Sequence, residues 1–589
     1  MSHPARGLNT IHVVGIGPED AIGLALREAF ENVLLFPDKR SLTTDVISLC
    51  VDIKSNETLI GPLTLPNRAG CWRCAFERIS AALATSEPNT EQDPLSPDEI
   101  FQKITPILVR EIQAINTDGP EQSSLLDHVL AVDLSTLDES LHRVIPLARC
   151  DVCGGAAAFP SIAHEQLHLS PEDSPEIVLG ALDGWVDRRT GVISNLFIEP
   201  PDDPRVSLPI VATAAPPHIM ERDGSLHRMP LGWGKGLTIS GAVLSAVGEA
   251  IERYSASIID PEKIVWKRHD ELEGDVLDPR DLGLYSDAQY ERDDFPFVRF
   301  DSSIPHPWVL GSWLNNGKRV WLPANFVFLF IELRQEQLIV QGTSNGLAAS
   351  TDKDDAALRA ILELVERDAF MTTWLTASQT QRLQLDDTLD PLLRTVLEGI
   401  EVLGASVEIY RLRASVIGTT VLCLAFGDGE HYPGVTFGLG CDLDPRAALR
   451  QAVLELGQTG PYLRRMMRSG VLTAAENPSG VREMLDHASY YFPKERATAF
   501  DRLRCEETIN LRKLKTVAKR SLQDCVAALD EAEVRVALVD VTAADVAIGP
   551  FSVMRAVSPD LQPIWYGYGL DRIHKLKVAS DVPPINPIW

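Results

Sequence analysis

Long apolar segments are missing from this sequence, and so is a targeting signal. No unbroken apolar run approaches the roughly 20 residues that a membrane-spanning helix needs. The first 34 residues contain Glu19, Asp20 and Glu28 instead of a positively charged start followed by an apolar stretch, which does not match a secretory signal. We therefore expect a soluble cytoplasmic protein with no membrane association.

Basic residues are also scarce. The chain has 55 Lys and Arg against 83 Asp and Glu, so its formal net charge is -28. Such a charge repels nucleic acid and anionic lipid, and it favours ligands that are cationic or bridged by a metal ion. We expect no nucleic-acid-binding role. A phosphate-binding loop of the form Gly-x-x-x-x-Gly-Lys-Ser/Thr is absent as well.

Cysteine is sparse and unevenly spaced. Nine cysteines are spread over 589 residues, which is not the pattern of a secreted domain held by disulfides. Four of them form two Cys-x-x-Cys pairs, at Cys71 and Cys74 and at Cys150 and Cys153. Two such pairs supply the four thiolates of a closed, structural Zn²⁺ site, which tertiary folding would have to assemble across the long gap. The alternative is two unrelated pairs, one of them redox-active.

The length of the chain predicts more than one domain. A stretch rich in Gly, Ser and Pro, between about residues 155 and 178, separates a first domain, residues 1–160, from a second, residues 175–589. In both, apolar strand-like runs alternate with amphipathic helical patterns. We therefore expect two domains of the α/β (α+β) class.

The first domain opens with a predicted strand at residues 11–15, a Gly-rich turn and a helix at residues 21–31. Asp20 stands where a dinucleotide-binding loop would have its third glycine, so we interpret the turn as structural. A polar loop at residues 86–96 then precedes an amphipathic helix from residue 97 to about 114. Before Cys71 we identify only this single strand-turn-helix unit.

Three predicted helices of the second domain carry polar groups on one face and an apolar stripe on the other. They are residues 241–255, 355–370 and 446–458, read at about 100° per residue. Their polar faces contain Ser245, Glu249, Glu252 and Arg253 in the first, Glu363, Glu366 and Arg367 in the second, and Gln451, Glu455 and Gln458 in the third. Taken singly, each is the pattern of a solvated helix face.

Lysine is absent from all three helices and their ends, residues 241–258, 354–370 and 444–458. A solvated face normally pairs Glu with Lys at i,i+4, whereas glutamates without such partners repel one another unless a cation neutralises them. Mg²⁺ held by carboxylates and polyphosphate oxygens is such a cation. Arg253 and Arg367 could bind phosphate directly, because guanidinium matches its oxygens in a bidentate way. The pattern indicates an ATP site built from helical carboxylates.

Three motifs in this order resemble those of the YcaO family. They are Gly234-Lys235-Gly236-Leu237-Thr238 with the first helix, Ser344-Asn345-Gly346-Leu347-Ala348 with the second, and the third helix itself. The resemblance covers about residues 175–589 and implies a large YcaO-type α/β domain. It also implies that a Cys, Ser or Thr side chain of a ribosomally made precursor peptide attacks the preceding amide carbonyl. ATP phosphorylates the oxygen, and loss of phosphate gives a thiazoline or oxazoline, as in bacteriocin or thiopeptide maturation.

The resemblance also implies roles for individual residues. Mg²⁺ would be held by Glu249, Glu252, Glu363, Glu366 and Glu455. Phosphate charge would be neutralised by Lys235, Arg253 and Arg367, and further nucleotide contacts would come from Ser245, Ser344, Asn345, Gln451 and Gln458. The candidate catalytic residues are Glu252, Glu366, Arg367 and Trp589, the last of which ends a proline-rich tail.

The first domain is similar to the zinc-bearing, ubiquitin-activating-enzyme-like (ThiF-like) domain that accompanies YcaO in thiazole/oxazole peptide synthetases, in shortened form. We find no winged-helix segment for leader-peptide binding before Cys71. The resemblance therefore implies a separate partner protein that binds the leader, and we expect a homodimer. Whether a flavin dehydrogenase of the same complex later oxidises the rings is left open.

Two other functions use the same motifs. A YcaO protein can install a thioamide or an amidine with an external nucleophile, although its usual members lack the four-cysteine domain. A non-catalytic scaffold that docks the precursor peptide would have no need to keep mutually repelling glutamates. The complete set of motif carboxylates therefore favours the cyclodehydratase.

Overall fold

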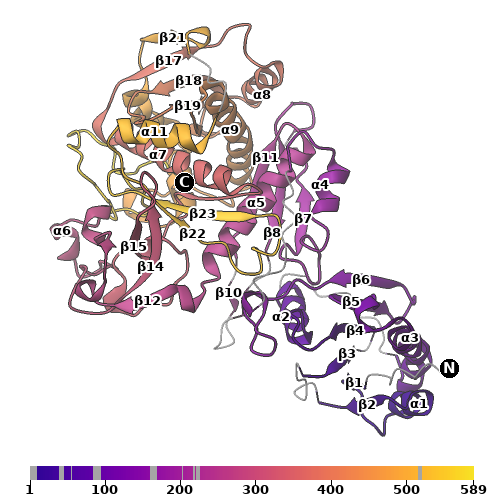
Figure 1. Ribbon diagram of the computed structural model, residues 1–589. Helices are drawn as coiled ribbons and strands as arrows, with labels where there is room; N and C mark the ends of the chain where they lie inside the picture. The colour runs from indigo at the N-terminus through magenta and orange to yellow at the C-terminus, as the bar shows by residue number, and fades with distance from the viewer. Residues whose placement is uncertain are drawn as a thin grey trace.

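A computed structural model of the chain describes residues 10–38, 45–54, 56–83, 95–158, 169–201, 203–216, 219–220, 226–227, 229–514 and 520–588. We call residues 10–158 the N-terminal part and residues 169–588 the larger part (Figure 1). The mixed α/β class is as predicted. Trp589 and most of the predicted loop at residues 86–96 lie outside the described residues. Within them, no helix has the length and apolar character needed to cross a bilayer.

A six-stranded mixed sheet forms the N-terminal part, in the order β2-β1-β3-β4-β5-β6. Strand β1 pairs in parallel with β2 and β3, and the other neighbours are antiparallel. In sheet order the strands are Val33–Phe36, Ile11–Val14, Ile47–Ile53, Glu57–Thr64, His128–Asp133 and Glu139–Arg143.

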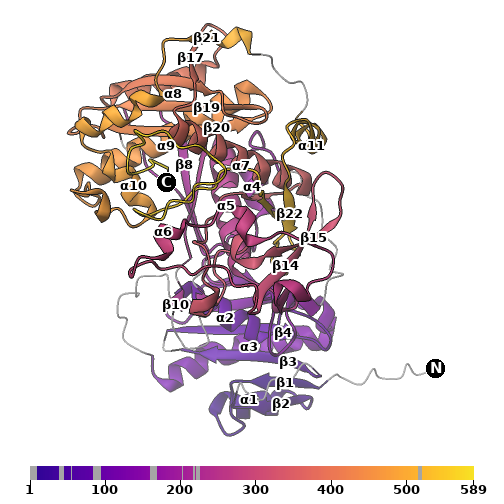
Figure 2. The same cartoon turned by 90° about the vertical axis from the view of Figure 1, so that its left-hand side faces the viewer.

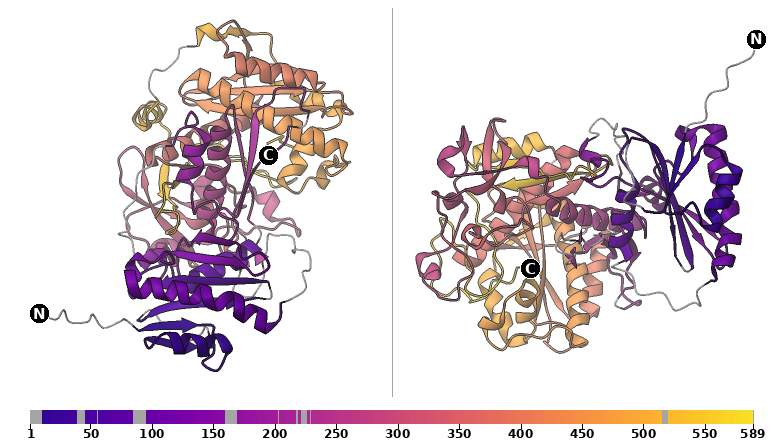
Figure 3. Two further views of the ribbon diagram at one scale, coloured as in Figure 1. Left: turned by 90° about the vertical axis from the view of Figure 1, so that its right-hand side faces the viewer. Right: turned by 90° about the horizontal axis from the view of Figure 1, so that it is seen from below.

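Side chains alternate between the two faces of this sheet. Leu49 and Val51 of β3 belong to the apolar cluster under α1 (Ala21–Ala29) and α3 (Pro97–Asp118). Cys50 points the other way, into the cluster that includes α2 (Trp72–Leu83). Figures 1 and 3 show α1 and α3 on the outer side of the sheet, whereas α2 lies on the side of the larger part.

The prediction of a single strand-turn-helix unit before Cys71 is wrong, because β2, β3 and β4 follow that unit. Strand β4 is buried along nearly its whole length, and such strands are apolar on both faces and show no alternating pattern. In the turn before α1, the Asp20 carboxylate accepts a hydrogen bond from the Gly17 amide at 2.6 Å. Helix α3 extends past its predicted end near residue 114.

Three sheets carry the larger part. The first is antiparallel and consists of β11 (Gly232–Gly236), β8 (Ile210–Ala215) and β7 (Asn195–Ile198). The second has the order β13-β15-β14-β22-β23-β16, and β12 also pairs with β14. Its strands are β12 (Ile264–Lys267), β13 (Asp275–Val276), β14 (His306–Trp313), β15 (Arg319–Pro323), β16 (Leu347–Ser350), β22 (Ala537–Asp540) and β23 (Ser552–Val557).

The third sheet has the order β20-β19-β18-β17-β21. Its strands are β17 (Thr380–Gln384), β18 (Ser406–Leu412), β19 (Thr419–Phe426), β20 (Val435–Asp442) and β21 (Thr508–Asn510), and a small pair is formed by β9 (Ile219–Met220) and β10 (Leu226–His227). The shorter helices of the larger part are α4 (Pro175–Ala181), α6 (Asp287–Tyr290), α8 (Pro391–Val402), α10 (Met484–Tyr490) and α11 (Leu522–Glu531).

The three predicted helices are the long helices at the centre of the larger part (Figure 2). They are α5 (Ile239–Ser257), α7 (Lys353–Thr376) and α9 (Pro445–Arg468), and each is longer than predicted. Helix α9 continues through Pro461, a residue type that usually breaks a helix interior. Strand β16 contacts α5 and α7, β20 contacts α7 and α9, and β11 contacts α5 and α9. The helices therefore lie around a common space.

Two strands pack so closely against these helices that only glycine fits at the points of contact. A Cβ atom on Gly234 of β11 would lie 2.1 Å from the Ala246 nitrogen of α5 and 2.2 Å from the Ala242 oxygen. A Cβ atom on Gly440 of β20 would lie 2.2 Å from the Ala448 oxygen of α9. No side chain fits in these positions, and the close packing brings the flanks of β11 next to the polar face of α5.

Candidate functional site

A cavity of about 540 Å³ lies where α5, α7 and α9 meet. Ten of the predicted site residues line it, namely Lys235, Ser245, Glu249, Glu252, Arg253, Glu363, Glu366, Arg367, Gln451 and Glu455. Behind them, the predicted apolar stripes are buried, as at Val247 of α5 and Val453 of α9. The helical periodicity therefore gave the correct faces, and the three motifs share one cavity.

The cations of this cavity pair with its glutamates. Lys235 Nζ lies 3.6 Å from a Glu455 oxygen, and Arg253 Nη2 lies 3.1 Å from a Glu249 oxygen. Arg253 Nε is 3.8 Å from Glu252 and Arg367 Nε is 3.6 Å from Glu366, both beyond hydrogen-bond distance. These three cations thus lie among five glutamates, and three further arginines that line the cavity, Arg359, Arg450 and Arg520, bring its cations to six.

Burial and the neighbouring charges change the acidity of the glutamates. Burial raises the pKa of Glu252 well above its usual range, and Glu363 and Glu249 add to the shift while Arg253 opposes it. Burial, opposed by Arg367, likewise raises the pKa of Glu363. The pKa of Glu366 is raised to about 8, by burial first and by Glu455 and Glu363 in addition, against the effect of Arg367. Each pKa shift reflects first the burial of the carboxylate, which the nearby arginine only partly offsets.

The donor set fits Mg²⁺ and a polyphosphate. The Nε atoms of Arg253 and Arg367 are buried and have no hydrogen-bond partner among the described residues, which leaves two guanidinium N–H groups for phosphate oxygens. The glutamates do not form a close metal-binding cluster like that of the cysteines. Mg²⁺ usually takes only one or two carboxylates and completes its octahedron with phosphate oxygens and water, so wider spacing suits it.

Three predicted nucleotide contacts do not line the cavity. Gln458 donates a hydrogen bond at 2.8 Å to the carbonyl of Trp233, and it faces a neighbouring pocket. Ser344 and Asn345 lie in the turn before β16, where the Asn345 side-chain oxygen is buried without a hydrogen-bond partner. Through its hydrogen bond to Trp233, Gln458 contacts β11, the strand that carries Lys235 of the first motif. The predicted catalytic residue Trp589 lies outside the described residues.

Several arginines of the site were not predicted. Arg359, Arg450 and Arg520 line the cavity, and Arg520 pairs at 3.1 Å with Asp442. The helical period could have identified Arg359, which lies one turn before Glu363. Arg555 of β23 is fully buried, and burial lowers its pKa to about 10 although Glu363 and Glu252 oppose the shift. An arginine within an apolar strand is unusual, and this was the available signal.

The four cysteines of the N-terminal part meet in one cluster. Cys71 and Cys74 stand at the start of α2, and Cys150 and Cys153 follow β6. All four sulfur atoms lie within 4.8 Å of one another, with 3.7 Å between Cys71 and Cys150 and between Cys74 and Cys153. Tetrahedral Zn–S bonds of about 2.3 Å place sulfurs about 3.8 Å apart, so the geometry fits zinc.

The surroundings of this cluster are closed. Cys71, Cys74 and Cys150 are each less than 9% exposed, and they pack in one apolar cluster with Trp72 and Val129. A bound Zn²⁺ would have four protein ligands and no open position for a substrate, so its role would be structural.

Comparison with known proteins agrees with this geometry. The family model described as "YcaO cyclodehydratase, ATP-ad Mg2+-binding" matches residues 233–562. An uncharacterized protein of Methanothermobacter thermautotrophicus strain Delta H is 27% identical over 257 residues, which are 43% of this chain and 62% of that protein. The chain thus spans less than two thirds of this curated relative.

Two solved structures share the fold of nearly the whole chain. A heterocyclase in complex with substrate and cofactor has a TM-score of 0.74 at 20% identity, over 95% of this chain and 81% of that one. The heterocyclase TruD has a TM-score of 0.63 at 19% identity, over 94% and 80%. Because the family model covers more than half of the sequence, the chain belongs to the YcaO cyclodehydratase family.

Proposed function

We propose that this protein is an ATP-dependent cyclodehydratase that converts Cys, Ser or Thr residues of a ribosomal precursor peptide to thiazolines or oxazolines. The observation that carries the proposal is the cavity in which α5, α7 and α9 collect five glutamates beside Lys235, Arg253 and Arg367. Membership of the family supports the same activity.

The residues of the cavity divide into two roles. Glu252, Glu363, Glu366 and Glu455, with Glu249 at the rim, would hold Mg²⁺, which supplies positive charge for the phosphates. The free Nε groups of Arg253 and Arg367 would donate to the transferring phosphoryl group. Phosphoryl transfer depends on position and charge stabilisation, so no protein nucleophile is required.

The reaction then follows from the substrate's own groups. The side-chain thiol or hydroxyl of the peptide loses its proton and attacks the preceding amide carbon, which gives an oxyanion. That oxygen displaces ADP from the γ-phosphate of ATP, and the phosphorylated intermediate expels phosphate while the amide nitrogen loses its proton. The net change is removal of one water from the peptide and hydrolysis of one ATP.

Substituting the charged glutamates tests the site. Glu252→Gln and Glu366→Gln keep the side-chain shape and remove the charge, so ATP consumption and peptide water loss should cease while the free energy of unfolding changes little. Glu398→Gln is the matched control, since Glu398 is an exposed helical glutamate of α8. Turnover is followed by phosphate release and by mass spectrometry of the peptide. Unchanged turnover in both cavity variants refutes the proposal.

We further propose that the N-terminal part is a ThiF-like docking domain with a structural zinc, and that a separate partner binds the leader peptide. The described residues between 10 and 70 form helix α1 and four strands, which all belong to one sheet. These described residues contain no winged helix, which supports a separate leader-binding partner. A partner that holds the leader raises the local concentration of the core peptide at the cavity.

A further inference from the structure

A buried ion pair joins the two parts of the chain. Arg78 of α2 lies 2.9 Å from an Asp545 oxygen in the segment between β22 and β23, and the two side chains are 2% and 0% exposed. The same oxygen accepts a hydrogen bond from the Tyr254 hydroxyl of α5 at 2.6 Å. We call these three residues the Arg78 bridge. Such a buried pair holds its geometry rigidly, because either charge left alone is strongly unfavourable.

Arg78, the bridge residue of the N-terminal part, lies next to the cysteine cluster. Arg78 follows Cys74 by one helical turn on α2. Its guanidinium also donates to the carbonyls of Ile145 at 2.6 Å and Pro146 at 3.0 Å, in the segment that leads to Cys150. One side chain therefore fastens both cysteine-bearing segments to Asp545.

The other end of the bridge holds the helix that carries the first motif. Tyr254 belongs to the buried stripe of α5, on the side opposite Glu249 and Glu252. A helix is a rigid rod over two turns, so a shift at Tyr254 moves Glu252 and Arg253 by a similar amount. The Arg78 bridge therefore holds the buried face of α5, and the opposite face of α5 lines the candidate active site.

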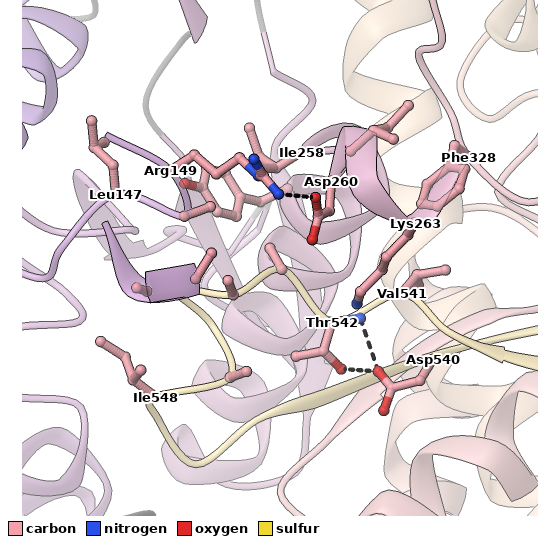
Figure 4. Close-up of a pocket in the computed structure, with 18 residues that line it drawn as sticks. Leu147, Arg149, Ile258, Asp260, Lys263, Phe328, Asp540, Val541, Thr542 and Ile548 are labelled. Atoms are coloured by element: carbon pink, nitrogen blue, oxygen red, sulfur yellow. Dashed lines mark hydrogen bonds and ion pairs between the residues drawn. The ribbon is translucent and has the colours of Figure 1, made fainter. Parts of the chain in front are cut away.

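A cavity lies beside the bridge, and of the three bridge residues Tyr254 lines it. This cavity of about 440 Å³ is lined by residues 147–149 of the N-terminal part and by Tyr254, Lys263 and Thr542 of the larger part. Figure 4 shows Arg149 reaching Asp260 at its edge, a pair with 2.6 Å between the nearest atoms. Side chains that line a cavity have fewer van der Waals partners on that side, so the polar links of Tyr254 contribute to the position of this end of α5.

The geometry points to Arg78 as a positioning residue of the nucleotide site, acting through Asp545 and Tyr254 on the α5 residues Glu252 and Arg253. The inference rests on the proposed function. It also assigns the N-terminal part a role beyond docking, because the fold around the cysteine cluster sets the geometry of the carboxylate helix. Binding sites require support to within about 0.5 Å, which a chain of buried polar contacts provides.

Two conservative variants test the bridge in the full-length protein. Tyr254→Phe removes one hydroxyl and leaves the ion pair intact. Arg78→Lys keeps the positive charge, but a lysine ammonium cannot donate hydrogen bonds to both carbonyls and the carboxylate in the geometry of the guanidinium. Each should weaken affinity for a fluorescent ATP analogue with Mg²⁺ about five- to tenfold, with KM for ATP raised more than kcat is lowered. Arg110→Lys is the control, since Arg110 lies on α3 at the outer side of the same part and pairs at 2.8 Å with Glu139 of β6.

The double variant separates positioning from general stability. If Arg78 acts through Tyr254, adding Arg78→Lys to Tyr254→Phe causes little further loss of affinity, whereas independent stabilising effects add. Affinity is measured at a temperature where circular dichroism shows every variant folded. Wild-type affinity in the folded single variants, or additive losses, overturns the inference. If instead the wild-type chain binds no Mg-ATP, the proposed function fails, which is a separate outcome.

Discussion

Substituting Gly234 by alanine should damage the nucleotide site without touching any charged residue. The added Cβ would lie 2.1 Å from the Ala246 nitrogen, where non-bonded heavy atoms normally stay about 3.5 Å apart. Since the opposing atoms are backbone, α5 or β11 must move by about 1 Å. Overpacking of this kind lowers the free energy of unfolding by about 1–3 kcal/mol. A displacement of about 1 Å of catalytic groups costs on the order of 100-fold in rate.

The measurement pairs this variant with a glycine that has space. Gly180 is exposed in α4 and a Cβ there meets nothing within 4 Å, so Gly180→Ala should stabilise its helix by up to about 1 kcal/mol and leave turnover unchanged. Urea unfolding gives the stability difference, and ATP consumption with precursor peptide gives the rate. If Gly234→Ala has the turnover and unfolding midpoint of the wild type, the close approach of β11 to α5 is wrong.

Three further predictions concern other parts of the chain. Elemental analysis should find about one zinc per chain, lost in Cys71→Ser and kept in Cys505→Ser, and a Cys71→Ser variant that retains its metal would contradict the site. Burial lowers the pKa of His487, whose ring nitrogens lie 2.6 Å from the Asn586 carbonyl and 2.8 Å from the Gly567 amide. The unfolded state therefore binds more protons below about pH 6.5, so stability should fall as the pH drops from there, and His487→Gln should flatten this loss in urea midpoints measured at a series of pH values. Finally, the chain alone should modify precursor peptide slowly and bind its leader weakly by fluorescence polarisation; tight binding and full-rate conversion by the isolated chain would exclude a leader-binding partner.

The helical periodicity predicted the centre of the fold because α5, α7 and α9 each have one apolar and one polar face. The sequence could not give their ends, since Pro461 lies inside α9 and caps such as Asp352 are ordinary surface residues elsewhere. In the N-terminal sheet, β1 was predicted, but β2, β3 and β4 were not. Strand β4 is buried on both faces and carries no alternating pattern that would distinguish it from other apolar segments.

The candidate site was predictable where its residues share a helix and unpredictable where tertiary folding adds them. Glu249 and Glu252 follow from spacing alone. Arg520 comes from a segment far from the motifs, and nothing local marks its approach to the cavity. For Arg555, the only local signal is an arginine within an apolar strand. The same limit applies to the Arg78 bridge, whose two charges are separated by 467 positions in the chain.

The shared core of the two parts restricts how this protein could be taken apart or recombined. Ile145, from the segment after β6, packs in the same apolar cluster as Val178, Trp185 and Tyr254. A larger part produced alone would lose that contact and also the arginine partner of Asp545, so it should be less stable than the full chain. Exchange of N-terminal parts between relatives should therefore succeed only when the incoming part also supplies an arginine for Asp545. The two predicted domains share core residues, so we expect them to fold together.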